Sequence, residues 1–461
     1  MGLFRFKHRA IFSLLVVLAG FVFAAPGCGG RVAPLQLSLL IPEDPDPLVG
    51  VETIRIRVTG TDMDAMLTES ARDALQIEVS QIPTGDDRVI TIEGLDGEGR
   101  ILSWGQTAPF TLSIASPSSL AVYFARNGQF SLAKARLLKG RYDHTLTALP
   151  DGRVVVAGGR TKNGPTSSVE IFQPNTRTFV EAASLNKPRS GHRAILVDDK
   201  IVFVAGEDGE PLKSVEIYDP TSGPVIELQL EEARAGHTVA ALPGNKVMVM
   251  GGENEGKELA SVEIIDVALR TISQGPALNS KRSRHIALGF DDGLVIVAGG
   301  QVSESGLALV TDAEIYKTET DGSAKWNSVS SLPDPRTNAV AVNLPDGRGL
   351  IVGGEDETGS TLRAAVIFDP KTEKFLPSDT TNAGYTNHAA AALGDGALVV
   401  GGKETREVAL LQGNFFVDGG QLLMNREDFE LAPLLDGTIL AAGGRNGSEI
   451  RDDAEFYTPQ R

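Results

Sequence analysis

The chain has 461 residues and is acidic, since 60 Asp and Glu residues against 43 Lys and Arg residues give a formal net charge of -17. This balance disfavours nucleic acid as a partner, because nucleic-acid binding needs basic patches that displace counterions from phosphates. Cys28 is the single cysteine of the sequence, which excludes CxxC zinc sites and a dithiol redox centre, so we expect no metal and no cofactor.

The first 28 residues have the pattern of a secretory signal peptide. Three basic residues precede an uncharged run over residues 10–23, which is too short for a comfortable membrane span. The segment that follows, Ala-Pro-Gly-Cys at residues 25–28, resembles a bacterial lipobox, in which the cysteine is diacylated and becomes the new N-terminus. We therefore expect a cell-envelope protein, anchored by Cys28 in the outer membrane or facing the periplasm. Simple cleavage after Ala24 is the alternative.

Residues 33–126 have a different pattern, in which short segments alternate between apolar and polar residues. Examples are Ile54–Val58, Ile77–Val79, Val89–Ile92, Phe110–Ile114 and Leu120–Tyr123. Such alternation is typical of strands with one face in water. The segments predict an immunoglobulin-like or fibronectin-like β-sandwich. Its expected role is that of a spacer between the membrane and the remainder of the chain.

From residue 127 to the C-terminus, a repeat of about 48 residues recurs seven times. The first copy begins at Arg141–His144, continues through an apolar stretch that ends in Gly158 and Gly159, and closes at Val169–Pro174. The same three pieces return in order in the following copies. The sixth copy has Tyr385 in place of the arginine, and the fifth and seventh have Ala339 and Phe429 in place of the histidine.

This pattern resembles the kelch repeat, in which a diglycine closes an apolar strand, an aromatic-bearing strand follows, and a fourth strand leads into the next unit. The resemblance covers residues 127–461 and implies an all-β fold, a seven-bladed kelch-type β-propeller. Each unit reads as four short strands separated by Gly, Asp, Asn and Pro clusters, which is the spacing of a propeller blade. One blade cannot bury both of its faces, but seven stacked around an axis can.

The sequence also predicts how the ring closes. The last copy ends at residues 456–461 without a fourth strand, whereas residues 127–136 align with the fourth strands of the first and fourth copies. We expect the strand at residues 127–133 to complete the seventh blade. Its loss would leave an open sheet edge, which invites aggregation.

Two residue types recur at fixed places in the repeat and are the candidate ligand-binding residues. They are Arg141, Arg189, Arg234, Arg282, Arg336 and Arg426, with Tyr385 at the equivalent place, and His144, His192, His237, His285 and His388. On one interpretation they line the mouth of a central channel and bind a carboxylate or a sugar. On the other they serve the fold, because they can satisfy backbone carbonyls between blades. Any pocket should be asymmetric and lie where blades five to seven interrupt the pattern.

Two enzyme classes occur on similar propellers. A copper radical oxidase resembling galactose oxidase needs a cysteine crosslinked to a tyrosine, and the propeller region has no cysteine. A sialic-acid-mutarotase-like enzyme would need only an acid, a base and an anion-binding arginine, and it stays open as an alternative. No catalytic residue is assigned.

The sequence thus predicts a non-enzymatic binding or scaffolding lipoprotein of the bacterial cell envelope. Its expected partners are a protein or glycan ligand and the membrane, which it would reach through its lipid anchor. The chain is expected to act as a monomer. A carbohydrate-active propeller and a purely structural subunit of an envelope complex are the alternatives.

Overall fold

The computed structural model describes residues 16–17, 35–73, 82–113, 118–303, 308–318 and 324–461. Cys28 and nearly all of the expected signal peptide lie outside the described residues, as does the expected strand Ile77–Val79. The described chain is all-β. It contains no helix long and apolar enough to cross a membrane. It divides into two compact units, the first made of residues 1–127, 435–437 and 460–461 and the second of residues 128–434 and 438–459.

The first unit contains two sheets. The smaller sheet has the order β1 (Val16–Val17), β2 (Leu35–Leu40) and β8 (Ser118–Tyr123), and β2 runs parallel to β8. The larger sheet has the order β4 (Met63–Ala71), β3 (Thr53–Gly60), β5 (Gly85–Leu95), β6 (Ile101–Gln106) and β9 (Ala125–Arg126), with β7 (Phe110–Leu112) paired to β5.

The segments that alternate between apolar and polar residues form strands of this unit, with one face buried and one face more exposed. In β3, Ile54, Ile56 and Val58 are buried, whereas the residues between them are more exposed. These side chains share one apolar cluster with Leu37 from β2 and Val122 from β8, so the two sheets have a common core. The sequence pattern located β3, β5, β7 and β8.

The second unit contains seven antiparallel sheets of four strands each in the described chain, which we number I to VII in chain order. Sheet I comprises β11 (Thr145–Ala148), β12 (Val154–Ala157), β15 (Val169–Gln173) and β16 (Thr178–Ala182). Sheet II comprises β17 (Arg193–Val197), β18 (Lys200–Val204), β21 (Ser214–Asp219) and β22 (Gly223–Gln229). Sheet III comprises β23 (Thr238–Leu242), β24 (Lys246–Met250), β27 (Val262–Asp266) and β28 (Thr271–Gln274).

Sheet IV comprises β29 (Ile286–Gly289), β30 (Val295–Ala298), β33 (Ala313–Thr318) and β34 (Ala324–Val329). Sheet V comprises β35 (Val340–Asn343), β36 (Gly349–Val352), β37 (Ala365–Asp369) and β38 (Lys374–Pro377). Sheet VI comprises β39 (Ala389–Leu393), β40 (Gly396–Val400), β41 (Glu407–Gln412) and β42 (Phe415–Gln421). Sheet VII comprises β43 (Glu430–Pro433), β44 (Ile439–Ala442), β47 (Asp453–Thr458) and β10 (Gln129–Arg136).

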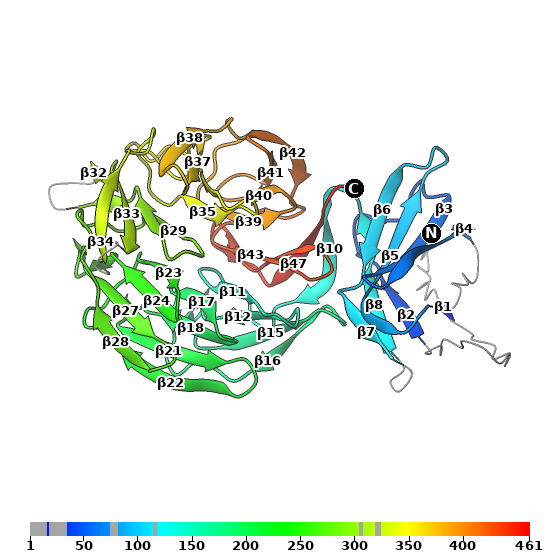
Figure 1. Cartoon of the computed structure of the whole chain (residues 1–461), viewed down its shortest axis with the longest axis horizontal. Helices are drawn as coiled ribbons and strands as arrows, with labels where there is room; N and C mark the ends of the chain where they lie inside the picture. The colour runs from blue at the N-terminus through cyan, green and yellow to red at the C-terminus, as the bar shows by residue number, and fades with distance from the viewer. Residues whose placement is uncertain (1–15, 18–34, 74–81, 114–117, 304–307, 319–323) are drawn as a thin grey trace, which may run out of the picture. The chain divides into compact units, whose positions relative to one another are not determined.

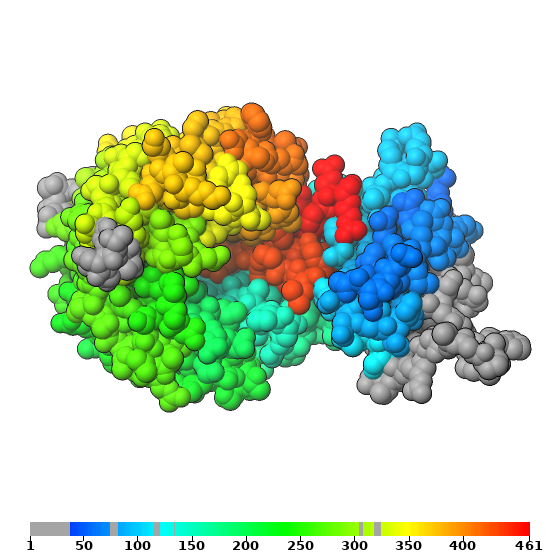
Figure 2. Space-filling model, viewed as in Figure 1, coloured from blue at the N-terminus to red at the C-terminus, as the bar shows by residue number. Residues whose placement is uncertain are grey.

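The seven sheets form a closed ring. Figure 1 shows them following one another around the second unit, and in Figure 2 the chain colours change in the same order. The first strand of each sheet contacts the first strand of the next, and β43 of sheet VII contacts β11 of sheet I. Apolar clusters join neighbouring sheets, as in the cluster shared by sheets II and III around Val204 and Val249. This arrangement is consistent with a β-propeller.

The closing strand lies where the sequence predicted it. β10 pairs antiparallel with β47, with Phe130 opposite Tyr457 and their ring centroids 5.1 Å apart. Because β10 precedes sheet I in the chain, sheet VII joins residues that are more than 300 positions apart in the sequence. The two ends of the second unit are therefore held in one sheet.

Short two-stranded hairpins follow the diglycine in sheets I, III, IV and VII and follow Ala205 and Gly206 in sheet II. They are β13–β14 (Arg160–Thr161 and Gly164–Pro165), β19–β20 (Glu207–Asp208 and Glu210–Pro211), β25–β26 (Glu253–Asn254 and Lys257–Glu258), β31–β32 (Gln301–Val302 and Ala308–Leu309) and β45–β46 (Arg445–Asn446 and Glu449–Ile450). Backbone bridges such as Ser190 with Glu207 and Ala235 with Glu253 join these hairpins to the segment just before each first strand. The hairpins thus lie at the end of the ring where the first strands begin.

Candidate functional site

The repeated arginines lie inside the sheets. All six are at most 1% exposed. Arg189 is typical, because Nη1 donates to the carbonyl oxygens of Ala205 (2.9 Å) and Ser214 (3.2 Å), and Nη2 donates to Oε1 of Glu216 (2.6 Å). Glu216 also accepts the backbone N–H groups of Asn186 and Lys187. The pair therefore fastens the loop before the first strand of sheet II to the third strand of the same sheet.

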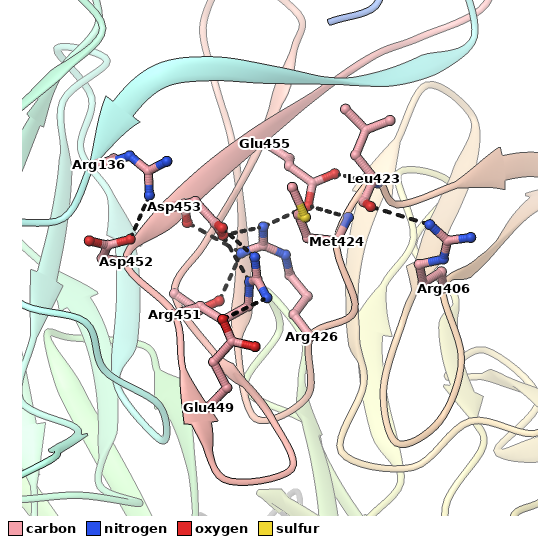
Figure 3. A network of polar contacts seen from close by, with 11 residues as sticks. Arg136, Arg406, Leu423, Met424, Arg426, Glu449, Arg451, Asp452, Asp453 and Glu455 are labelled. Atoms are coloured by element: carbon pink, nitrogen blue, oxygen red, sulfur yellow. Dashed lines mark hydrogen bonds and ion pairs between the residues drawn. The ribbon is translucent and has the colours of Figure 1, made fainter. Parts of the chain in front are cut away.

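The same arginine–glutamate pair occurs in five sheets. Figure 3 shows the pair of sheet VII, in which Arg426 also contacts Asp453. The five pairs are Arg141–Glu170, Arg189–Glu216, Arg234–Glu263, Arg282–Glu314 and Arg426–Glu455, with separations of 2.6 to 2.8 Å. The guanidinium groups donate to carboxylate and carbonyl oxygens of their own sheet, whereas one of the two interpretations of the sequence placed their acceptors between blades.

Sheets V and VI lack the glutamate. Arg336 of sheet V donates to the carbonyl oxygens of Gly353 and Ala364, and its nearest carboxylate is that of Asp334 at 3.5 Å. Val366 occupies the glutamate position there. Sheet VI replaces the arginine by Tyr385, whose hydroxyl donates to Oδ1 of Asn382 (2.8 Å). Tyr385 is fully buried and is not presented to a ligand.

The repeated histidines pack between sheets. A Cβ added to the first glycine of a diglycine would lie 2.7 to 2.9 Å from Cε1 of the histidine in the next sheet, as for Gly158 with His192 and Gly251 with His285. In sheet VII, Phe429 fills this place against Gly401. These glycines have positive φ, which lets the chain turn while the ring approaches closely. The diglycine and the histidine therefore form one packing unit at four of the boundaries, those of Gly158, Gly251, Gly353 and Gly443.

Burial keeps the histidines uncharged. It lowers the pKa of His144 and His388 to about 3 and that of the other three well below the usual value, and neighbouring arginines lower most of these pKa values further. Two of the rings share a hydrogen bond with a threonine of the preceding sheet. Nε2 of His192 lies 3.1 Å from Oγ1 of Thr145, and Nε2 of His285 lies 2.7 Å from Oγ1 of Thr238.

A cavity of about 380 Å³ lies where the first strands of the sheets converge. It is asymmetric, because sheets IV to VII contribute most of its lining and sheet I contributes none. Of the candidate residues named from the sequence, His285 and His388 line it, whereas the six arginines and Tyr385 do not. The lining residues are Arg193, Thr238, Val239, His285, Ile286, Ala287, Ala339, Val340, Ala341, His388, Ala389, Ala390, Phe429, Glu430 and Leu431.

Two charged residues that the sequence reasoning missed lie in this cavity. Arg193 and Glu430 both follow directly after the histidine position of their repeats, where the other sheets have Thr145, Thr238, Ile286, Val340 and Ala389. Aligning the seven copies and reading the column after the histidine would have found both. Nε of Arg193 donates to the carbonyl oxygen of His237 (3.1 Å), and Oε2 of Glu430 accepts the backbone N–H of Leu146 (2.7 Å).

Arg193 and Glu430 influence each other across the cavity. Burial raises the pKa of Glu430, and the positive charge of Arg193 opposes that rise. The same guanidinium lowers the pKa of His237 and His285, which places it near the middle of the converging strands. Within the described chain no direct ion pair joins Arg193 to Glu430. The cavity therefore holds one cation and one carboxyl group that are not paired with each other.

A ring of backbone turns lies directly before the cavity. The residue that precedes each histidine position has positive φ in all seven repeats, from Asp143 to Asp428. Several of these residues are joined by hydrogen bonds across sheet boundaries, as from the N–H of Asp143 to the carbonyl oxygen of Asp428 (3.0 Å). Burial, together with the charge of Asp428, raises the pKa of Asp143 to about 7. Arg445 donates to Asp428 (2.6 Å).

Among the described residues, no group of three or more His, Cys, Asp and Glu side chains is placed to hold a metal ion. The acidic hairpins are among these described residues, except for residues 304–307, which lie outside them. The chemistry that the site offers is therefore that of the charged and hydrogen-bonding side chains named above.

Comparison with known proteins shows the Kelch motif at residues 141–186 and 188–223, which correspond to sheet I and most of sheet II. Kelch-like protein 35 from Mus musculus is 29% identical over 222 residues, covering 48% of this chain and 36% of that protein. Kelch-like protein 36 from Mus musculus is 26% identical over 239 residues (49% and 37%), and alpha-scruin from Limulus polyphemus is 23% identical over 198 residues (40% and 21%).

The chain thus spans little more than a third of the length of Kelch-like proteins 35 and 36. Among solved structures, that of YjhT aligns with 12% sequence identity and a TM-score of 0.44, over 69% of this chain and 95% of that one. The Kelch motif and the similarity to Kelch-like proteins support a kelch-repeat protein.

Proposed function

We propose that this chain is a binding module, a seven-bladed kelch-type β-propeller that recognises a protein partner through the hairpins at one end of its ring. One observation carries this proposal: the polar residues that repeat are used inside the fold, whereas the hairpins after the diglycines differ from sheet to sheet. Loops held by a rigid scaffold are where recognition residues are usually found. Kelch repeats are associated with protein binding, which agrees with this assignment.

The charge of these hairpins indicates what the partner would present. The hairpins of sheets II and III carry Glu207, Asp208, Glu210, Glu253 and Glu255, and the loop of sheet V carries Glu355, Asp356 and Glu357. Asp208, Glu210, Glu255 and Glu357 are exposed. A partner with a basic surface would be attracted to this face, and the attraction should weaken as the ionic strength rises.

The carbohydrate-active alternative needs an acid, a base and an anion-binding arginine. The six repeated arginines do not supply that arginine, because they donate to buried acceptors of their own sheets. The protein-binding alternative needs no such residues.

The test is a pull-down from an envelope extract with the full chain carrying Cys28→Ala, compared with Glu210→Lys in the same background. Glu181→Lys on the outer strand β16 is the matched control, since Glu181 is also exposed but lies on the side of sheet I. We expect one defined protein to be captured by the wild type and the control, lost with Glu210→Lys and released by added NaCl. Capture that is indifferent to both the hairpin charge and the salt would contradict the proposal.

We also propose that the chain is exported and anchored in the cell envelope through Cys28, and that residues 33–126 act as a sandwich-type spacer. The support for the anchor is the lipobox-like segment at residues 25–28. Expression of the full chain in bacteria with radiolabelled palmitate should label the wild type and leave Cys28→Ala unlabelled. Equal labelling of the two proteins, or none in either, would show that Cys28 is not acylated.

A further inference from the structure

Arg193 is the one Lys or Arg side chain among the residues that line the cavity. Its hydrogen bond to the carbonyl oxygen of His237 uses Nε. In the described part of the chain no hydrogen bond or ion pair occupies Nη1 or Nη2 of Arg193. A guanidinium edge with two free donors matches the two oxygens of a carboxylate. Arg193 is exposed in this cavity, so its guanidinium edge is open to an anion that the arginine ring of the repeats does not reach.

One further polar group faces the same space. Oε2 of Glu430 is engaged by Leu146, which leaves Oε1 for a ligand. His388 also lines the cavity, but it is 5% exposed and both of its ring nitrogens are sealed from solvent. The carboxyl group of Glu430 suits a ligand hydroxyl, because its free oxygen can accept the hydroxyl proton.

The remaining lining restricts the size and the polarity of a ligand. Ten of the fifteen lining residues are alanine, valine, isoleucine, leucine or phenylalanine, yet polar atoms form the larger part of the surface that faces the cavity. The volume of about 380 Å³ lies at the lower end of the range for small-molecule sites and is too small for a folded partner. The cavity therefore favours a small polar ligand, whereas a phosphate or a highly charged polyanion would meet the carboxyl group of Glu430.

We propose that this cavity binds a small hydroxycarboxylic acid, with the ligand carboxylate held by Nη1 and Nη2 of Arg193 and the ligand hydroxyl donating to Oε1 of Glu430. The alkyl part of the ligand packs on the alanine and valine side chains of sheets V and VI. This site is separate from the hairpin surface of the proposed function, so either can fail without the other.

The experiment measures binding of lactate and of 2-hydroxyisovalerate to the full chain carrying Cys28→Ala, by saturation-transfer NMR and calorimetry. Lactamide serves as the uncharged analogue. We expect both acids to bind and lactamide to bind at least tenfold more weakly, because it lacks the charge that pairs with the guanidinium (about tenfold per 1.4 kcal/mol).

Two variants that should change the affinity for the acids in opposite directions separate a binding role from a structural one. Arg193→Gln should weaken acid binding by about tenfold or more, whereas Glu430→Gln should strengthen it because it removes a negative charge that faces the ligand carboxylate. Arg153→Gln is the control, since Arg153 lies in the turn between β11 and β12 and pairs with Asp151. Thermal unfolding of each variant verifies that it is folded. The amide Glu430→Gln retains an oxygen that can accept the N–H of Leu146.

The proposal is overturned if neither acid binds at about 10 mM, a concentration about tenfold above a weak Kd of about 1 mM. It is also overturned if lactamide binds as well as lactate, or if folded Arg193→Gln binds both acids like the control. Loss of binding in Arg193→Gln together with tighter binding in Glu430→Gln supports it, because a purely structural role would not move the two affinities in opposite directions.

Discussion

Removing one member of a buried arginine–glutamate pair should destabilise the second unit strongly. In sheet II, Arg189 and Glu216 are both 0% exposed and lie 2.6 Å apart. The change Glu216→Ala leaves a buried guanidinium without its counter-charge, which costs about 3–5 kcal/mol when one partner of such a pair is removed. It also leaves two backbone N–H groups without their acceptor. We expect a total loss of about 4 kcal/mol or more in the free energy of unfolding.

The chain itself supplies the compensating change. Sheet VI has Tyr385 at the arginine position and Ala409 at the position where five other sheets have the glutamate, so a pair without charges is compatible with this fold. The double variant Arg189→Tyr with Glu216→Ala should therefore be more stable than the sum of the two single changes predicts. The expected coupling is about 2–3 kcal/mol, the upper range for residues in direct contact.

The assay is equilibrium unfolding in urea, followed by intrinsic fluorescence, for the wild type, the two single variants and the double variant. A loss below about 1 kcal/mol for Glu216→Ala would show that the pair behaves like an exposed one. Strict additivity in the double variant would show that the two side chains act independently. Either result would refute the argument that the repeated arginines are held by buried charge pairing.

Three further predictions test other parts of the second unit. Asp143→Asn should raise stability at pH 8 by at most about 4 kcal/mol and flatten its pH dependence between about pH 4 and pH 7. The reason is that the pKa of Asp143 is about 7 in the folded protein and 3.8 ordinarily, so the wild type loses stability as the pH rises through this window. Thermal unfolding measured across this pH range checks the prediction. Equal pH dependence of the two proteins would contradict it. Gly251→Ala should lower the free energy of unfolding by about 2 kcal/mol or more, because the new Cβ would lie 2.6 Å from the carbonyl oxygen of Arg282 at a φ of +55°. Gly256 lies in an open turn, so Gly256→Ala should be tolerated better in the same urea titration. Phe130→Ala should lower the free energy of unfolding by about 3–5 kcal/mol and promote aggregation, because it loosens β10 from sheet VII. If the variant scatters light no more than the wild type on heating, the closing role of this strand is contradicted.

The architecture of the second unit could be predicted because it repeats. A recurring pattern of arginine, histidine, diglycine and an apolar third strand defines the repeat even where one copy deviates, as the sixth does at Tyr385. The closing strand could be placed for the same reason, since the last copy ends without the fourth strand that residues 127–136 supply. The pairing of β10 with β47 confirms this.

The roles of the repeated residues could be narrowed from the sequence but not decided. An arginine beside a channel can bind a ligand or hold a loop, and the sequence pattern is the same in both cases. The structure shows that Glu216 and its equivalents, which lie about 27–32 residues further along the chain, supply the counter-charge. Pairing over such a separation depends on the register of the first and third strands.

The sequence by itself determined the repeat, the number of repeats, the strand that closes the last one, and the positions where glycine is required. These features are local or periodic, so spacing reveals them. Only the tertiary structure showed that Arg193 and Glu430, which are 237 positions apart and look like ordinary strand residues, face one cavity. Converging strands bring side chains of different repeats together around a common axis, and that convergence is a property of the closed ring rather than of any single repeat.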